Sequence, residues 1–546
     1  MKKNLKRMFA LLFMAVMLTG LCACSKEKTT TQPETQNAPT TTEPEKENMV
    51  AETKDPITLE FYYRGNGQQQ DTEKVQERVN ELLKEYPGLE HVSINLNCST
   101  GAEYPEHVSL AESAGQQIDL LSCVSLDFTQ KVREESYMPL NDLISNDLKT
   151  ELPEWLWDLG SVDGNIYIVP NYQQAANKTF LFTPKEYMDK YGDYDKIKDV
   201  LTNPSSTWQE IADVMAEYLI AVREGEGDTK YLPSLGYQIL TSGGTQGFYF
   251  CDNYFDVFSN NFCVERGSNK VEYRLTSDKA KAAYSLAAEW YDKGYIYPDI
   301  LTVDPSELRF KNMLNPKSWI LSYNGAVGDA ESVAKTYSET WGFDVVAIPC
   351  QQQYYISNTW AAGGTGIHST CKNPEEAIKF LEALTTGTEI GKEIYNTLVF
   401  GIEGTHYVKS ENDSERIETL EYSSAQGGVD TSYAGLRWIL GNTFYAYKNQ
   451  AITDTQNDLA LEVNEGSDTL KSELAGFTVD TNSISMQLEQ VNAVVKEYEA
   501  ILKQGVLGTA GWEAYYNEFE KKLKAAGVED IVVEYQKQLD EYLAKK

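Results

Sequence analysis

Polar side chains follow two stretches of the sequence that have the apolar pattern of β-strands. Arg64 and Asn66 come just after the first stretch, and Ser122 and Asp127 follow a later one. Strands alternating with helices around them predict a parallel sheet with crossover helices, whose strands end at one edge. Ligands of such sheets bind beyond that edge. These guanidinium, amide, hydroxyl and carboxylate groups are therefore expected on one rim, where they could hydrogen-bond a polar ligand. Each could instead be a loop residue with a local role.

The elements that must position this rim are short and alternate in type. Residues 57–63 alternate apolar and polar side chains at a period of two, which predicts the first strand. A helix is predicted over 71–86, where apolar residues share one face and Pro-Gly follows. Two more strands are predicted over 92–96 and 118–121, with a helix over 107–114 between them.

The residues that usually carry metal or nucleophilic chemistry are sparse. Histidines occur singly along the chain, with no cysteine or carboxylate at ligand spacing, so neither a zinc site nor a Ser/His pair is expected. Two glycine clusters, at 243–247 and 363–366, lack the Lys-Ser/Thr of a phosphate loop and are interpreted as turns or close-packing sites. We expect no metal, no cofactor and no catalytic residue. The four histidines are His91, His107, His368 and His406.

The charge and the aromatic content limit the possible partners. The net charge is −34, so nucleic acid is not expected, because phosphate binding needs a basic face. The same charge disfavours a polyanionic ligand, although a local pocket can differ from the average. Tyrosine outnumbers phenylalanine by 35 to 18, and there are nine tryptophans. Such amphipathic rings suit surfaces that stack on a ligand with apolar and hydroxyl faces, although many would simply be core.

The N-terminus has the pattern of an exported protein. Four basic residues precede an apolar run over 8–18 that is too short to span a bilayer stably. The run ends in Leu-Cys-Ala-Cys, which resembles the lipobox of bacterial lipoproteins and makes Cys24 the expected site of lipidation. An ordinary secretory signal with an incidental cysteine is the alternative. Residues 25–55 are polar and expected to be disordered, with a stretched reach of roughly 100 Å.

Six cysteines remain beyond Cys22 and Cys24, and an even number permits disulfides in an exported protein. The spacing does not determine their pairing. Cys251 and Cys263 are the best local candidates, and the alternative is that most are small buried thiols. The roughly 490 residues that follow the tether exceed what one core usually covers, so at least two lobes are expected.

Short motifs in order along the chain carry a family resemblance. The sequence resembles the extracellular solute-binding proteins of ABC importers, of the family 1 type that includes sugar binders. It is most similar to a Gram-positive lipoprotein subset with an extra C-terminal domain of unassigned function. The matching stretches are 58–71, 113–120, 137–143, 163–171, 206–211, 373–377, 400–407, 438–442 and 491–542.

The resemblance implies an α/β, two-lobed fold of the periplasmic-binding-protein type II, with hinge crossings and a helical C-terminal extension. The crossings would fall near 170–174, 349–353 and 400–406. The implied organisation is a lipoprotein signal peptide at 1–23, a disordered tether at 24–55, lobe 1 at 56–172, lobe 2 at 173–349, a return of lobe 1 at 350–400, and a helical region at 401–546 that packs mainly on lobe 2.

The candidate ligand-binding residues lie where strands or crossings would meet the cleft. Sugar rings offer a flat face to Trp and Tyr, and their hydroxyls need paired donors and acceptors such as Arg, Asp, Asn and Gln. Arg437 and Trp438 could equally serve packing. The set comprises Arg64, Asn66, Ser122, Asp127, Tyr172, Gln173, Tyr323, Asn324, Trp360, Glu403, Arg437 and Trp438.

The implied function is capture of a small solute, with an oligosaccharide favoured, and its delivery to ABC permease subunits. The protein would be a monomer without enzymatic activity, anchored by lipid on the extracellular face of the cell membrane. A peptide binder is the nearest alternative. A lipid-anchored glycoside hydrolase that uses two carboxylates is another. A surface adhesin without a small ligand is the third.

Overall fold

The computed structural model describes most of the chain beyond the tether. The predicted signal peptide, Cys24, Cys251 and Trp360 lie outside the described residues. The described ranges are 54–227, 255–265, 267–296, 298–302, 322–356, 363–420, 432–449 and 454–545.

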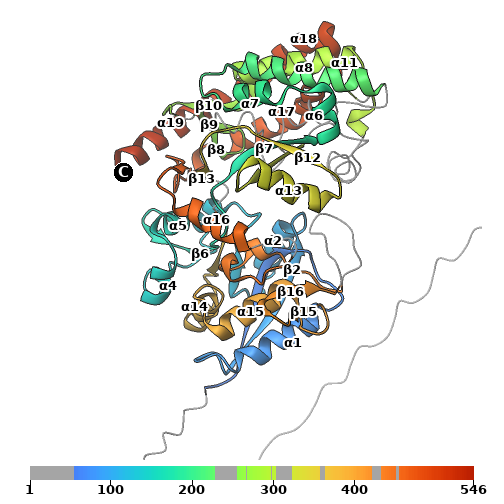
Figure 1. Ribbon diagram of the computed structural model, residues 1–546. Helices are drawn as coiled ribbons and strands as arrows, with labels where there is room; N and C mark the ends of the chain where they lie inside the picture. The colour runs from blue at the N-terminus through green and yellow to red at the C-terminus, as the bar shows by residue number, and fades with distance from the viewer. Residues whose placement is uncertain are drawn as a thin grey trace, which may run out of the picture. The chain divides into compact units, whose positions relative to one another are not determined.

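A five-stranded sheet organises the first lobe. Its order is β2-β1-β3-β14-β6, and β1 is parallel to both β2 and β3. The three predicted strands and their parallel arrangement are therefore confirmed, with β1 and β2 longer than expected. Figure 1 shows β2 and β6 of this sheet in the same half of the folded chain as α1, α14 and α15. The five strands are β1 (Ile57–Gly65), β2 (Val92–Thr100), β3 (Leu120–Ser122), β14 (Gly364–Ile367) and β6 (Ile168–Pro170).

Helices cover this sheet and bury its apolar face. In α1 (Thr72–Leu83), Val75, Val79 and Leu82 recur at helical spacing and are fully or almost fully buried. They contribute, with α14 (Pro374–Ala383) and α15 (Glu389–Phe400), to the core of the first lobe. Val79 and Leu82 pack there with Phe380 and Ile394.

A three-stranded antiparallel sheet, β11-β7-β12, lies in the second lobe. Its strands are β7 (Lys178–Pro184), β11 (Ser322–Ala326) and β12 (Val345–Pro349). A capping box starts α8 (Trp208–Glu226), with Thr207 and Glu210 bonding each other's backbone. The neighbouring helices are α6 (Lys185–Tyr191), α7 (Tyr194–Thr202) and α13 (Ala330–Trp341).

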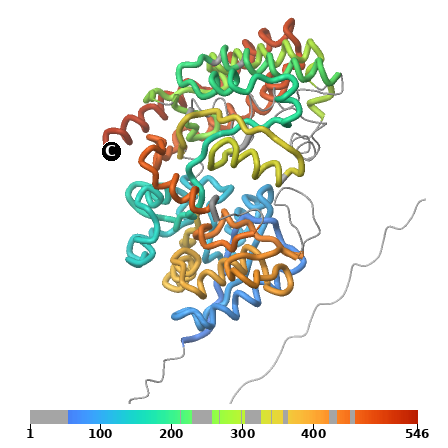
Figure 2. The backbone as a smooth tube through the Cα atoms, viewed as in Figure 1, coloured from blue at the N-terminus to red at the C-terminus, as the bar shows by residue number. Residues whose placement is uncertain are grey.

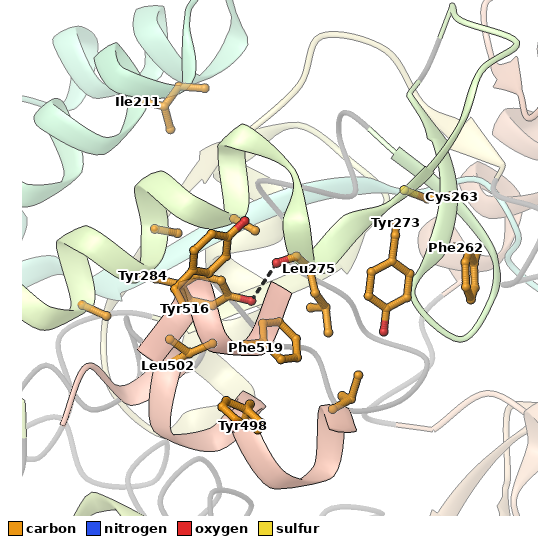
Figure 3. Packing of buried hydrophobic residues seen from close by; sticks show 14 of the residues in the cluster. Ile211, Phe262, Cys263, Tyr273, Leu275, Tyr284, Tyr498, Leu502, Tyr516 and Phe519 are labelled. Carbon is orange, nitrogen blue, oxygen red and sulfur yellow. Dashed lines mark hydrogen bonds between the residues drawn. The ribbon is translucent and has the colours of Figure 1, made fainter. Parts of the chain in front are cut away.

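The C-terminal helices share the core of the second lobe. Figure 3 shows Tyr284 of α11 (Asp278–Asp292) beside Tyr516 and Phe519, with its hydroxyl donating to the Leu275 carbonyl at 3.3 Å. In Figure 2 the red tube of the C-terminal end lies beside the green tube of the middle of the chain. This region therefore folds as part of a lobe. Its helices are α17 (Ser485–Gln504), α18 (Gly508–Ala525) and α19 (Val528–Lys545).

The remaining elements are helices, short 3-10 turns and short strands, of which β8, β9 and β10 form a three-stranded sheet and β13 pairs with β17 in parallel. They are α2 (Tyr104–Ser113), α3 (Phe128–Arg133), α4 (Asn146–Glu151), α5 (Glu154–Leu159), β4 (Ser161–Val162), β5 (Asn165–Ile166), β8 (Phe255–Ser259), β9 (Phe262–Glu265), β10 (Val271–Tyr273), η1 (Arg274–Thr276), η2 (Ile300–Thr302), β13 (Tyr355–Ile356), β15 (Tyr407–Ser410), β16 (Asp413–Thr419), η3 (Arg437–Ile439), η4 (Thr443–Tyr445), α16 (Asp454–Glu465), β17 (Leu470–Lys471) and η5 (Asn482–Ile484).

Three segments pass between the lobes and are hydrogen-bonded to one another. Asn177 and Tyr355 exchange backbone bonds of 3.1 and 3.0 Å, and the Leu470 N–H donates to the Tyr354 carbonyl at 2.9 Å. The buried carboxylate of Asp256 accepts the Tyr355 hydroxyl at 2.6 Å. We propose that the first two segments continue the crossings expected near 170–174 and 349–353.

The third segment lies later in the chain than the sequence interpretation placed it. The residues around the expected crossing at 400–406 form a turn, where Gly401 ends α15 with φ 85° and leads to the β15-β16 hairpin. Ile439 and Val463 pack in the core of the first lobe, whereas Leu474 packs in that of the second. We therefore propose that this crossing runs over 465–474, and that residues 401–464 belong to lobe 1 and not to lobe 2.

The described cysteines are buried. Cys98 and Cys371 are free thiols with 8% and 9% exposure. The suggested pairing of Cys251 with Cys263 stays a prediction, because Cys251 lies outside the described residues.

Asn464 should be a large contributor to stability, because it ties the first crossing to α16. Its side-chain oxygen accepts the Ala175 and Ala176 N–H groups, each at 2.9 Å, and its amide donates to the Gln173 carbonyl at 2.8 Å. Asn464→Ala would leave buried backbone groups without partners, and should lower the free energy of unfolding by about 3 kcal/mol. Urea unfolding measures this. The exposed Asn482→Ala is the control, and equal midpoints for the two variants would contradict the assignment.

Candidate ligand-binding site

The strand ends of the first lobe meet at one edge, as the sequence predicts. Gly65 pairs with Thr100 at the carboxyl ends of β1 and β2. Ser122, which ends β3, pairs with Thr365, and the β6 residue Pro170 pairs with Gly364. The carboxyl ends of four strands and the amino end of β14 therefore form a common edge, which we call the sheet edge.

At the sheet edge, Arg64 lies over the indole of Trp438. Its Cζ atom is 4.7 Å from the ring centroid, within the range of a cation–π contact. Gly101, just beyond β2, leaves room for this arrangement, because a Cβ there would come within 2.7 Å of the Arg64 Nε atom. Loss of hydration lowers the pKa of Arg64. The Nε–H is fully buried and has no hydrogen-bond partner.

Two polar side chains bring the Trp438 loop to Arg64. The Gln69 amide donates to the Ala434 carbonyl at 2.9 Å and accepts the Ala434 N–H at 2.9 Å. The Asn66 amide donates to the same carbonyl at 2.9 Å. Residues after β1 and residues before Trp438, far apart in sequence, are therefore fixed to each other.

Two side chains hydrogen-bond the backbone of the turn that carries Arg437 and Trp438. The buried Tyr395 donates its hydroxyl to the Arg437 carbonyl at 2.9 Å, and Asn171 donates to the Trp438 carbonyl at 3.4 Å. The side chains of Arg437 and Trp438 are both half-buried. Loss of hydration lowers the pKa of Arg437, and among the described residues no carboxylate pairs with it. Both residues can therefore present groups to a ligand while their backbone serves packing.

Of the other predicted residues of the first lobe, one lies at the sheet edge and two form hydrogen bonds within the protein. Gln173 lies at the edge, since its Nε2 atom is 4.0 Å from the position of a Cβ on Gly363. Ser122 is fully buried and its hydroxyl accepts the Val124 N–H at 3.3 Å. Tyr172 is buried and donates its hydroxyl to Glu465 at 2.9 Å. The geometry favours supporting roles for Ser122 and Tyr172.

The two predicted carboxylates are already engaged. Asp127 caps α3 by accepting the Gln130 N–H at 2.9 Å. Glu403 is exposed in the turn before β15 and pairs with Lys409 at 3.5 Å. The structure does not bring either of them to Arg64 through any contact in the described part of the chain.

Fewer of the predicted ligand-binding residues of the second lobe have side chains that the structure describes. Tyr323 and Asn324 lie in β11, next to β7, but their side chains and Trp360 fall outside the described set. Lys178, the first residue of β7, places its Nζ atom 4.4 Å from the Tyr354 ring centroid, and loss of hydration lowers its pKa. The sequence analysis missed Lys178, Gln69, Gly101 and Asn171; of these, Gln69 and Asn171 lay within stretches that carried the family resemblance.

Within the described ranges, no cluster of three or more His, Cys, Asp or Glu residues could hold a metal ion. None of the helices in the described part of the chain is both long and apolar enough to cross a membrane.

The buried Arg64 Nε–H gives a direct spectroscopic test of the Arg64–Trp438 contact. In protein labelled with ¹⁵N-arginine, its Nε–H signal should exchange slowly with solvent and should shift when Trp438 is replaced by leucine, because the ring current disappears. The Arg416 signal, from a side chain with 39% exposure, should exchange fast and stay in place. A fast-exchanging Arg64 signal that ignores Trp438→Leu would disprove the contact.

Comparison with known proteins finds similarity over nearly the whole chain. Residues 473–544 match the family described as "Domain of unknown function (DUF3502)". The chain is 22% identical over 507 residues to a protein named carbohydrate ABC transporter substrate-binding protein from Streptococcus pneumoniae serotype 4. The match covers 91% of this chain and 93% of that one.

Solved structures share the fold. The N-glycan transport solute binding protein (NgtS) from Streptococcus pneumoniae matches with a TM-score of 0.68 and 20% identity, covering 90% of this chain and 100% of that one. Its complex with Man5GlcNAc matches with a TM-score of 0.62 and 20% identity, covering 90% and 99%. The sequence-based resemblance is thus confirmed: the chain has the two-lobed α/β fold of the solute-binding proteins of ABC importers, with a DUF3502 domain at its helical C-terminal end.

Proposed function

We propose that the protein is the substrate-binding component of a carbohydrate ABC importer and captures an oligosaccharide at the sheet edge. The observation that carries this proposal is the Arg64–Trp438 pair. Trp438 is half-buried and can offer part of its ring face to a sugar, and the Arg64 Nη groups keep unused donors for hydroxyls. The relatives named above, which are carbohydrate-transport proteins, support the same ligand class.

The three crossings supply the conformational change that capture requires. A few residues at the ends of these segments can absorb the dihedral changes of a hinge while their mutual hydrogen bonds persist. A ligand touched by both lobes favours the closed form, because only that form makes both sets of contacts. A permease can then distinguish loaded from empty protein by its shape.

The groups identified at the sheet edge suit binding better than hydrolysis. Glycoside hydrolysis uses two carboxyl groups that flank the bond to be cleaved. The two carboxylates that the sequence suggested for the site, Asp127 and Glu403, cap a helix and pair with a lysine. Guanidinium, amide and indole groups hold a sugar without cleaving it. We therefore propose that the protein is not an enzyme.

We propose that this function lies at the outer face of the membrane, because the N-terminus resembles that of an exported lipoprotein. Acylation of Cys24 would anchor the chain, and a tether of about 30 residues gives the folded part a reach of roughly 100 Å. A monomer on such a tether can collect a sugar and still meet ABC permease subunits in the same membrane.

A ligand screen tests the proposed function. The soluble protein that begins at Ser25 is heated with neutral and acidic oligosaccharides and with peptides, and the recovered ligand is analysed by mass spectrometry. A bound sugar at 100 times its dissociation constant should stabilise the protein by about 2.7 kcal/mol and be recovered intact. Stabilisation by peptides alone would favour the peptide importer, and cleaved sugar would show a hydrolase.

Trp438→Leu should weaken the affinity for the sugar found in that screen by tenfold or more, as for a buried aromatic anchor, while the melting temperature of the free protein changes little. Isothermal titration calorimetry measures the affinity. The matched control is Trp512→Leu in α18, which removes an indole from the C-terminal region. Equal losses in both variants, or no loss in Trp438→Leu, would remove Trp438 from the site.

Cys24→Ser should abolish incorporation of labelled palmitate and release the protein from the membrane fraction. Wild-type protein serves as the reference, and Cys22→Ser is the control, because Leu21 before Cys22 does not fit the lipobox. Continued labelling of Cys24→Ser would show that another residue carries the anchor.

A further inference from the structure

Three cationic side chains in and near the site lack a carboxylate partner. Arg64, Lys178 and Arg437 are half-buried, and none of them forms an ion pair with any described residue. Loss of hydration lowers the pKa of each. Lys503 is the other described cation whose pKa is lowered, to about 8, and it does pair, with Glu499.

The other described arginines differ from Arg64 and Arg437, because each of them has a polar partner. Arg78 pairs with Glu393 at 2.8 Å. Arg133 pairs with Asp480 at 3.6 Å. The others bond carbonyl, amide or carboxylate oxygens: Arg223 to Gly227, Arg274 to Asn261 and Arg416 to Asp413. The arginines left without an anionic or oxygen partner are those at the sheet edge.

An unpaired cation that has lost hydration is costly, and this chain has an excess of acidic residues with which to pair it. The net charge of −34 makes carboxylates plentiful, yet none of those in the described ranges forms an ion pair with these three groups. Two of the cations lie instead on aromatic faces, Arg64 on Trp438 and Lys178 on Tyr354. Aromatic faces orient a cation and leave its hydrogen-bond donors unused.

The donors of both arginines remain within reach of a ligand. Among the guanidinium nitrogens of Arg64, Nε alone is fully buried without a partner, so the two Nη atoms keep surface. No nitrogen of Arg437 is both fully buried and without a partner. The surrounding protein nevertheless removes part of the hydration of this guanidinium and lowers its pKa. Both guanidinium groups have thus lost hydration, and each keeps nitrogen atoms that are neither fully buried nor hydrogen-bonded within the described residues.

The cations come from both lobes. Arg64 and Arg437 belong to the first lobe, whereas Lys178 begins β7 of the second. Lys178 follows Pro170 of the sheet edge by eight residues, which limits their separation to roughly 28 Å even for a fully extended chain. An oligosaccharide of several units can extend over such a distance.

Resting on the proposed function, we propose that the captured oligosaccharide is acidic: a carboxylate-bearing sugar whose anionic group is bound by Arg64 at the sheet edge, with Arg437 and Lys178 making the surrounding cleft positive. The planar guanidinium fork matches a carboxylate with two parallel hydrogen bonds. Sulfate esters share this charge, and the experiment separates the two sources.

The acidic surface of the protein limits the length of such a ligand. At physiological salt, charges more than about 8 Å apart are largely screened, so a short glycan with one or two acid groups experiences mainly the cations nearby. A long polyanion would extend over the acidic surface and be repelled. The expectation from net charge against polyanions and the positive site are therefore compatible.

The test compares matched glycans on the soluble protein. Titration calorimetry measures binding of sialyllactose and of short uronate oligosaccharides, each against its carboxyl-reduced form, and of sulfated lactose against lactose. We expect at least one acidic sugar to bind tenfold or more tightly than its neutral counterpart, with a preference that falls as salt rises. Preference for the sulfated sugar alone would overturn the assignment of a carboxylate.

Equal binding of acidic and neutral forms would refute this inference and leave the proposed function standing. Binding of no glycan in the whole panel, with stabilisation by peptides, would refute both. Arg64→Gln and Lys178→Gln should each reduce the acid-to-neutral preference at least threefold, while neutral binding changes less. Lys185→Gln, from an exposed ion pair with Asp189, removes the same charge and should leave the preference unchanged. An unchanged preference in Arg64→Gln that melts like wild type would also contradict the inference.

Discussion

The backbone hydrogen bonds between Asn177 and Tyr355 join two of the segments that link the lobes, and the rest of the structure depends on them. A third segment bonds to the second through Leu470. Polar groups enclosed at such a junction need partners, and Asp256 and Asn464 supply them from outside the crossings. The cores of the two lobes can then be separate, because the junction keeps the segments in register while each lobe buries its own apolar residues.

The proposed site also depends on contacts between residues that are far apart in sequence. Arg64 and Trp438 are far apart in sequence, and Gln69 and Asn66 fix the two loops by bonding Ala434. The absence of a side chain at Gly101 leaves room for the guanidinium over the indole. We propose that this aromatic ring, with the cation that lies over it at the sheet edge, receives the ligand.

Local pattern was sufficient for β1, β2 and β3 of the first sheet, and insufficient for β14, whose glycines were interpreted as a turn or close-packing site, and for the path of the chain. The alternation over 57–63 and the helical spacing of Val75 and Val79 report burial directly, so these elements were predictable. The glycine-rich turn after α15 has the composition of a domain boundary, whereas the proposal that the chain stays in lobe 1 rests on the packing of Ile439 and Val463. Arg64, Asn66 and Trp438 could be proposed from the sequence because strand ends and a family motif mark them. Lys178 has no local signal, since its role depends on Tyr354, more than 170 residues away.

Small-angle X-ray scattering of the soluble protein, titrated with the oligosaccharide that binds it, tests the central claim most directly. Capture between hinged lobes predicts a radius of gyration that decreases saturably with ligand, with the same midpoint as binding, and a ligand recovered intact. A radius that stays constant through saturation would contradict the account.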